Sequence, residues 1–163
     1  MIKIRDAVID DLPTMLEIYN DAVKNLTATF DLEEHSLEQR KVWFQQHGGR
    51  FPLIVALIDD LVVGYCCLSP YRDKPGYSRS TELSIYLSRE HRGKGIGTSL
   101  MKELVGRTRQ LGFHTLIGGI SSGNIASVKL HEKFGFSFVG RFLEVGFKFG
   151  EWQHVDFYQL ILD

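Results

Sequence analysis

The stretch "STELSIYLSREHRGKGIGTSLMKEL", residues 80–104, joins an apolar, strand-like run to a glycine-rich basic turn that opens a helix. Glycines at alternate positions from 93 to 97 let the backbone of this turn approach a ligand closely. The first turn of the helix offers unpaired N–H groups and the positive end of its dipole, and Arg92 and Lys94 add charge. These features favour a bound phosphate or pyrophosphate. Taken alone, they are equally compatible with a tight basic loop that holds no ligand.

Two familiar phosphate-binding motifs do not fit this turn. A P-loop requires lysine followed by serine or threonine, but Lys94 is followed by Gly95. A dinucleotide-binding fingerprint requires a third glycine where this chain has Thr98. The turn also lies mid-chain, after several strands that read as antiparallel. Neither nucleotide-binding fold therefore fits.

The rest of the chain predicts one mixed sheet covered by helices. Apolar residues recur at helical spacing over 12–26, and Ser36 with Gln39 forms a capping-box pattern for a second helix that reaches about His47. The other predicted segments are strands at 2–5, 53–58, 61–69 and 81–87, a helix at 95–112, a strand at 114–120, a helix that starts near residue 124 and ends at the "KFGF" segment, and strands at 136–147 and 155–162.

Length and composition indicate a single domain, residues 1–163. A chain of 163 residues with 44% hydrophobic residues can bury one sizeable core but not two. A net charge of −1 gives no overall attraction to nucleic acid or to an anionic membrane. No apolar run approaches the roughly 18 residues of a membrane span, and we expect no secretory leader. We therefore expect a cytoplasmic protein without nucleic-acid or membrane partners.

The cysteines, histidines and phenylalanines are expected to be mainly structural. Cys66 and Cys67 are adjacent, so in a strand they point to opposite faces, which argues against a disulfide scaffold or a multi-cysteine zinc site. No two histidines have metal-ligand spacing on one helix, and no metal is expected. The aromatic residues of the last third are expected to form core; they are Phe136, Phe138, Phe142, Phe147, Phe149 and Phe157.

Two motifs give the chain a family resemblance. "RGKGIG", residues 92–97, resembles the Arg/Gln-x-x-Gly-x-Gly/Ala acyl-CoA signature of the GCN5-related N-acetyltransferases (GNAT), whose turn amides hold the CoA pyrophosphate. "NIASVKLHEKFGF", residues 124–136, is similar to the family's second signature. The resemblance implies an α/β (α+β) fold: a mixed, mostly antiparallel sheet of about seven strands with about four helices.

Further segments resemble one subfamily, the phosphinothricin and methionine sulfoximine acetyltransferases. They are "TATF" at 27–30, "TELSIYLS" at 81–88, the histidine of "LHEKFGF", and "GFKFGEWQHVDFYQL" at 146–160. The resemblance implies transfer of acetyl from acetyl-CoA to the α-amino group of a small amino-acid-like compound, and a homodimer.

Glu82 is the candidate general base. The attacking amine must be neutral, yet an α-amino group with a pKa of about 8 is mostly protonated near pH 7. A carboxylate beside the acyl site can remove that proton, directly or through water, and burial would raise its pKa toward the working range. From the residues alone, Glu82 would instead read as a solvent-facing or ion-paired glutamate beside Ser84 and Tyr86. The resemblance favours the role of general base for Glu82.

His131 is the second catalytic candidate. It occupies the helix position where many relatives have a tyrosine that protonates the departing thiolate and where the subfamily has histidine. An imidazole that titrates near pH 6.5 can donate or relay that proton. The alternative is a surface or core histidine that makes one hydrogen bond. Backbone N–H groups near Leu87 are expected to polarise the thioester carbonyl.

The resemblance also implies two sets of binding residues. Those expected to contact acetyl-CoA are Ile85, Tyr86, Leu87, Arg92, Gly93, Lys94, Gly95, Ile96, Gly97, Thr98, Asn124, Ser127 and Lys133. Those expected to contact the acceptor are Phe30, Tyr71, Arg72, Lys74 and Tyr77. Arg72 and Lys74 suit a carboxylate or phosphinate, although either alone also reads as surface charge. Lys74 departs from the arginine usual in the subfamily and lacks its bidentate fork.

Two other functions stay open at this point. The acceptor could be a peptide N-terminus, a lysine or an aminoglycoside, although the Arg72 and Lys74 loop favours a small anionic amino acid. The protein could also bind CoA as a sensor without turnover, which the presence of both Glu82 and His131 disfavours.

Overall fold

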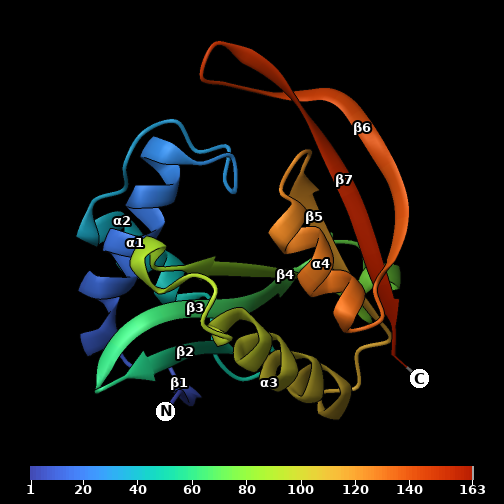
Figure 1. Cartoon of the computed structure of the whole chain (residues 1–163). Coiled ribbons are helices and arrows are strands. Elements are labelled where there is room, and N and C mark those ends of the chain that lie inside the picture. The colour runs from blue at the N-terminus through green and yellow to red at the C-terminus, as the bar shows by residue number, and fades with distance from the viewer. Residues whose placement is uncertain (163) are drawn as a thin grey trace.

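The order of helices and strands along the chain agrees with the order predicted from the sequence. The computed structural model describes residues 1–162, and its seven strands form one sheet in the order β1-β2-β3-β4-β5-β7-β6 (Figure 1). The elements are β1 (Lys3–Asp6), α1 (Leu12–Asn25), α2 (Leu37–Gln45), β2 (Leu53–Ile58), β3 (Leu61–Pro70), β4 (Ser80–Leu87), α3 (Ile96–Gln110), β5 (Thr115–Ser121), α4 (Ile125–Lys133), β6 (Ser137–Lys148) and β7 (Glu151–Ile161). All neighbouring strands are antiparallel except β4 and β5.

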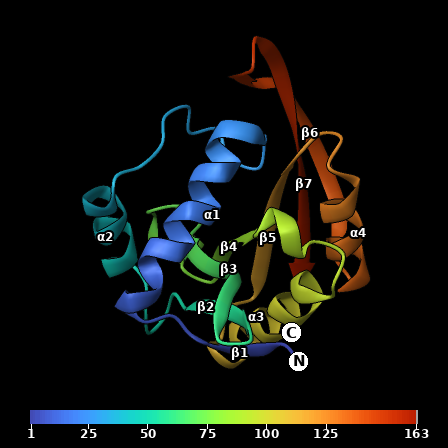
Figure 2. The same cartoon turned by 60° about the vertical axis from the view of Figure 1, so that its left-hand side comes forward.

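The helices cover the two faces of the sheet in pairs. Met15 of α1 and Trp43 of α2 pack on the face that carries Cys67, whereas α3 and α4 pack on the face that carries Cys66. Figure 2 shows α1 and α2 on one side of the sheet and α4 on the other. The adjacent cysteines therefore point to opposite faces, as predicted, and both are buried. Within residues 1–162, no helix is long and apolar enough to cross a membrane.

Local sequence explains where the helices on the first face begin. The side chain of Ser36 accepts a hydrogen bond from the backbone N–H of Gln39, and the Gln39 side chain accepts one from the Ser36 N–H, which is the predicted capping box. Asp11 precedes α1, but its carboxylate instead accepts from the backbone N–H of Val8 and from Arg5. The start of α1 is thereby fastened to β1.

The parallel ladder between β4 and β5 is short. Only Ser80–Glu82 pair with Thr115–Ile117, although β4 continues to Leu87 and β5 to Ser121. Beyond Glu82 the two strands separate, so their facing backbone edges have no strand partner there. A separation of this kind leaves backbone N–H and C=O groups free to bind an extended ligand.

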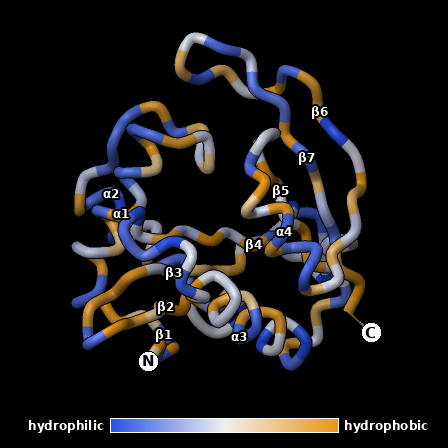
Figure 3. Tube along the Cα trace, in the orientation of Figure 1, coloured by the Kyte–Doolittle hydropathy of each residue, from blue (hydrophilic) through white to orange (hydrophobic). Residues whose placement is uncertain are grey.

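The last two strands form a hairpin that is longer than predicted. β7 begins at Glu151 rather than at Val155, because Phe149 and Gly150 both have positive φ, 56° and 72°, and make a tight turn. Figure 1 shows the tip of this hairpin rising beyond the sheet on the side of α1. Figure 3 shows polar and apolar residues in turn along the hairpin, whereas β2 and β3 are largely apolar.

The expectation that the late phenylalanines form core is wrong for most of them. Phe136 is buried, but the side chains with 51–60% of their surface exposed are Phe138, Phe142, Phe147 and Phe149. Phe157 is half-buried. The error arises because both faces of β6 are apolar, and a strand pattern alone does not say whether each face is covered within one chain.

Candidate active site

The separation of β4 and β5 opens a narrow cavity of about 80 Å³. It is lined by Ala28, Leu83, Ser84, Ile85, Tyr86, Gly119, Ile120, Ser121, Asn124, Ser127 and His131. Both strands and the start of α4 thus contribute. Of the residues expected to contact acetyl-CoA, Ile85, Tyr86, Asn124 and Ser127 line this cavity directly.

The basic turn lies at the start of α3 and has the backbone that its glycines predict. Gly93 and Gly95 have φ of 75° and 83°, and α3 begins at Ile96 directly after Gly95. A side chain at either glycine would be strained in this region of φ. The N–H groups of the first turn of α3 have no acceptor within the helix and suit a pyrophosphate.

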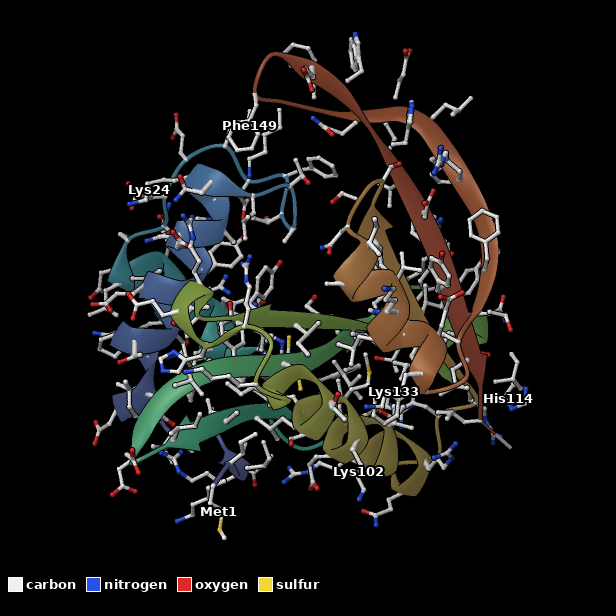
Figure 4. The ribbon with its side chains drawn as sticks, in the orientation of Figure 1. Met1, Lys24, Lys102, His114, Lys133 and Phe149 are labelled. Atoms are coloured by element: carbon white, nitrogen blue, oxygen red, sulfur yellow. The ribbon has the colours of Figure 1, made fainter. Side chains whose placement is uncertain are left out.

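The second motif lies against the first. A methyl group added at Gly97 would lie 3.3 Å from a methyl of Leu130, so the start of α3 and α4 are in close contact. Lys133 Nζ donates to Thr98 Oγ1 at 3.4 Å, and Figure 4 labels this lysine at the end of α4. Asn124 caps α4 by accepting from the N–H of Ser127 at 3.2 Å. The two motifs therefore form one continuous surface leading to the cavity.

His131 is buried beneath β5, with 2% of its surface exposed. Its Nδ1 lies 2.7 Å from the carbonyl oxygen of Ser127, and because a carbonyl can only accept, Nδ1 carries the hydrogen. Nε2 has no hydrogen-bond partner among the described residues and lies against Gly118, where a methyl group would approach it to 2.7 Å. Burial lowers the pKa of His131, and the hydrogen bond to Ser127 only partly offsets this. The imidazole is neutral, with a free lone pair on Nε2.

Glu82 lies at the last rung of the short ladder, paired with Ile117. Leu83 belongs to the core under α3, so Glu82 faces the opposite side of the sheet, where α1 lies. There it lines a larger cavity of about 570 Å³ together with Arg72. Burial raises the pKa of Glu82, and the nearby charge of Arg72 partly opposes the rise. A half-buried carboxylate with a raised pKa suits a general base.

The residues expected to bind the acceptor are brought together only in part. Tyr71 and Arg72 line the Glu82 cavity, whereas Lys74 and Tyr77 line a neighbouring cavity of about 290 Å³. The guanidinium of Arg72 lies 5.1 Å from the centre of the Tyr71 ring and borders both cavities. Phe30 stands elsewhere, against Gly146 near the tip of the hairpin.

The expected oxyanion position, near Leu87, lies at the far end of β4 from Glu82. Leu87 lies five positions after Glu82 along β4, a span of roughly 16 Å. Leu87 instead packs against Gly64 and Gly97, near the start of α3.

Lys148 is a buried charged residue that the sequence pattern did not single out. Its side chain is buried and donates hydrogen bonds from Nζ to the carbonyl oxygens of Ala22, Leu26 and Thr29. The only sequence sign is a lysine between two phenylalanines at the end of a largely apolar strand. Within residues 1–162, no three His, Cys, Asp or Glu side chains are placed to hold a metal ion.

Comparison with known proteins agrees with this geometry. Residues 14–136 match the acetyltransferase (GNAT) family. The chain is 40% identical over 163 residues to the L-methionine sulfoximine/L-methionine sulfone acetyltransferase of Pseudomonas aeruginosa, covering 99% of this chain and 95% of that protein.

Two solved structures extend the comparison. The phosphinothricin acetyltransferase from Sinorhizobium meliloti in complex with acetyl-CoA is 39% identical, with a TM-score of 0.95 over 99% of this chain and 88% of the other. The ribosomal-protein-alanine N-acetyltransferase from Brucella melitensis is 42% identical, with a TM-score of 0.94 over 98% and 99% of the two chains. The chain belongs to the GNAT acetyltransferase family and is an N-acetyltransferase. Within the family it is similar to the phosphinothricin and methionine sulfoximine enzymes.

Proposed function

We propose that this protein transfers the acetyl group of acetyl-CoA to the α-amino group of a small, anionic amino-acid-like compound. The observation that carries the proposal is that Glu82 and Arg72 line one cavity beside the separation of β4 and β5. The carboxylate can take a proton from the amine while the guanidinium attracts a carboxylate or phosphinate group. The named activities of the Pseudomonas and Sinorhizobium relatives support this substrate class.

In the proposed reaction the amine attacks the thioester directly, in a ternary complex. The amine nitrogen forms a bond to the acetyl carbon, its proton passes to Glu82 directly or through water, and the carbon–sulfur bond then breaks. The leaving thiolate takes up a proton. Burial raises the pKa of Cys66 far above its ordinary value and that of Cys67 to about 12, so neither thiol suits an acyl-enzyme.

His131 acts as a relay in this scheme. Because Nδ1 already donates to Ser127, only Nε2 is free, and in the neutral ring it can accept but not donate. A proton taken up at Nε2 can be passed on to the thiolate, which restores the neutral ring. Glu82 and His131 would then serve the two sides of the reaction, the incoming amine and the outgoing thiol.

We also propose that the protein is a homodimer. Large apolar side chains on both faces of the hairpin, here together called the stripe, are more than half exposed: Phe138, Val139, Phe142, Leu143, Val145, Phe147 and Trp152. So many large apolar side chains on one hairpin are typical of a surface that is covered by a partner. Both cysteines are unpaired, which fits the reducing cytoplasm as the proposed location.

A thiol-release assay with a panel of amines tests the activity. The panel contains methionine sulfoximine, methionine sulfone and phosphinothricin, with a peptide bearing a free N-terminal alanine, lysine and an aminoglycoside as competing classes. Preferential release of CoA with the first three supports the proposal. Preference for the peptide would instead favour the activity named for the Brucella relative. Binding of acetyl-CoA without release in any reaction would indicate a sensor.

A further inference from the structure

The side chain of Lys148 makes an unusual set of contacts for a lysine. It lies at the end of β6 with 3% of its surface exposed. Its three N–H donors match three backbone carbonyls: Ala22 at 3.3 Å, Leu26 at 2.5 Å and Thr29 at 2.8 Å. No carboxylate lies within ion-pair distance among the described residues. The buried charge is therefore satisfied by the polypeptide backbone of a distant segment.

One of these carbonyls, that of Ala22, belongs to the last turn of α1, whereas Leu26 directly follows the helix and Thr29 lies in the loop beyond it. The last carbonyls of a helix lack N–H donors within it and carry the negative end of its dipole, so an ammonium group there is favourable. The loop, Leu26–Asp31, is here called the strap. Lys148 thus joins the tip of the β6–β7 hairpin to the strap across about 120 residues of sequence. In Figure 4 the neighbouring Phe149 lies at the hairpin tip and Lys24 on α1 beside it.

The strap crosses the entrance of the acyl cavity. Ala28 lines that cavity, and its carbonyl accepts a hydrogen bond from the Tyr86 hydroxyl of β4 at 3.4 Å. Thr27 Oγ1 lies 2.8 Å from Ser121 Oγ on β5. The strap therefore contacts both strands that separate to form the cavity.

A second contact joins the strap to the hairpin. The Phe30 ring packs directly on Gly146, where an added methyl group would approach ring carbons to 2.8 Å. Gly146 is two residues from Lys148, so the contact and the three hydrogen bonds act on the same segment. Any shift of the hairpin tip is therefore transmitted to the strap.

We propose that Lys148 is a positioning residue for the acceptor amine. It fixes the strap over the acyl cavity, and the strap in turn sets where the acceptor stands relative to the thioester. In the proposed function acetyl-CoA is held mainly by the turn at the start of α3 and by α4, which Lys148 does not touch. Tyr86, whose hydroxyl contacts the strap, lies on the same face of β4 as Glu82, so the strap covers the acyl cavity from the side of the proposed base. The inference rests on the proposed function and deepens it by naming a residue that controls acceptor binding rather than cofactor binding.

The test compares Lys148→Met, Lys148→Arg and, as a matched control, Lys102→Met on the exposed surface of α3. We expect Lys148→Met to raise the KM for the acceptor by at least about tenfold, because three charged hydrogen bonds are lost. The KM for acetyl-CoA should stay close to wild type, Lys148→Arg should recover part of the loss, and Lys102→Met should change neither constant.

A second variant keeps the test decisive if Lys148→Met does not fold. Gly146→Ala pushes on Phe30 without altering any charge, and we expect the same selective rise in acceptor KM. Hydrogen exchange should also increase at the strap and not at the turn of residues 92–97. Equal changes in both KM values, or a loss of thermal stability with unchanged KM values, would overturn the positioning role. An inactive wild-type enzyme would instead contradict the proposed function.

Discussion

Glu82 and His131 lie on opposite faces of the sheet at the point where β4 and β5 separate. Glu82 is paired with Ile117 at the last rung of the ladder, and Nε2 of His131 lies against Gly118, the next residue of β5. An acetyl group held in the separation would have a carboxylate on one side and a neutral imidazole on the other. This arrangement allows one group to deal with the amine and the other with the thiol.

Replacement of Glu82 by glutamine tests the proposed base. The base must be ionised, and burial raises the pKa of Glu82, so wild-type turnover should fall as the pH drops through this raised value. Glu82→Gln should lower turnover about 10²-fold or more near pH 7 and much less at high pH, where the amine is already neutral. Turnover measured from pH 6 to pH 10 checks this, and an identical pH profile in the variant would exclude the role.

Arg72 provides an independent check on the same carboxylate. Its positive charge opposes the rise in the pKa of Glu82. Arg72→Gln should therefore move the acid limb of the profile to higher pH, besides raising the acceptor KM. An acid limb that stays in place would mean that it reports another group.

His131 is tested by two substitutions of similar bulk. His131→Phe keeps the packing against Phe136 but removes Nε2, whereas His131→Gln retains a polar group near that position. We expect a loss in kcat of at least about 10²-fold for the phenylalanine variant and a smaller loss for glutamine, with little change in the KM for acetyl-CoA.

The pH dependence distinguishes a relay from a permanently protonated acid. Because burial lowers the pKa of His131, the ring is neutral throughout the range above about 6.5, its ordinary value. The ratio of wild-type to variant kcat should therefore be constant above that pH and decrease below it. A ratio that declines as the pH rises from 7 to 9 would show that the charged imidazole is the active form.

Gly95 in the basic turn and Gly106 inside α3 allow a matched comparison of glycine-to-alanine substitutions. Gly95 has a φ of 83°, whereas Gly106 lies inside α3 with open space around its Cα. Gly95→Ala should destabilise the fold by about 1–2 kcal/mol and raise the KM for acetyl-CoA. Gly106→Ala should stabilise it by about 0.5–1 kcal/mol and leave that KM unchanged. Denaturant unfolding and acetyl-CoA titration measure both effects, and equal behaviour of the two variants would contradict the proposed pyrophosphate turn.

The absence of an acyl-enzyme is tested at the cysteines. Cys66 and Cys67 are buried, and burial raises the pKa of each thiol. Incubation with acetyl-CoA without acceptor should leave the protein mass unchanged, and Cys66→Ala and Cys67→Ala should keep turnover near that of the wild type. An acetyl group trapped on either sulfur would replace the ternary mechanism with a two-step one.

Local patterns predicted most of the fold and the backbone of the basic turn. The capping box at Ser36, the glycines of the basic turn and the cap at Asn124 all depend on residues a few positions apart. Such contacts are visible in a sequence because spacing alone sets them. The order of elements followed from periodicity for the same reason.

Contacts between distant segments were not predictable in this way. Arg40 is buried between the rings of Tyr19 and Trp43 and donates to the Tyr65 hydroxyl, yet on α2 it reads as an ordinary surface arginine. Lys148 likewise depends on carbonyls about 120 residues away. The residues expected to bind the acceptor line two different cavities, and only the tertiary structure could show this.

The exposed stripe of the hairpin leads to the final prediction, which concerns the homodimer. Leu143 is 70% exposed within the stripe, and Leu32 is 67% exposed in the segment between α1 and α2, outside it. If a second copy covers the stripe, Leu143→Glu buries a charge without a partner and should weaken association by several kcal/mol, whereas Leu32→Glu should not. Light scattering coupled to size-exclusion chromatography should give a dimer for the wild type and Leu32→Glu, and mainly monomer for Leu143→Glu. A monomeric wild type, or a Leu143→Glu dimer as stable as the wild type, would show that another surface or no second copy is involved.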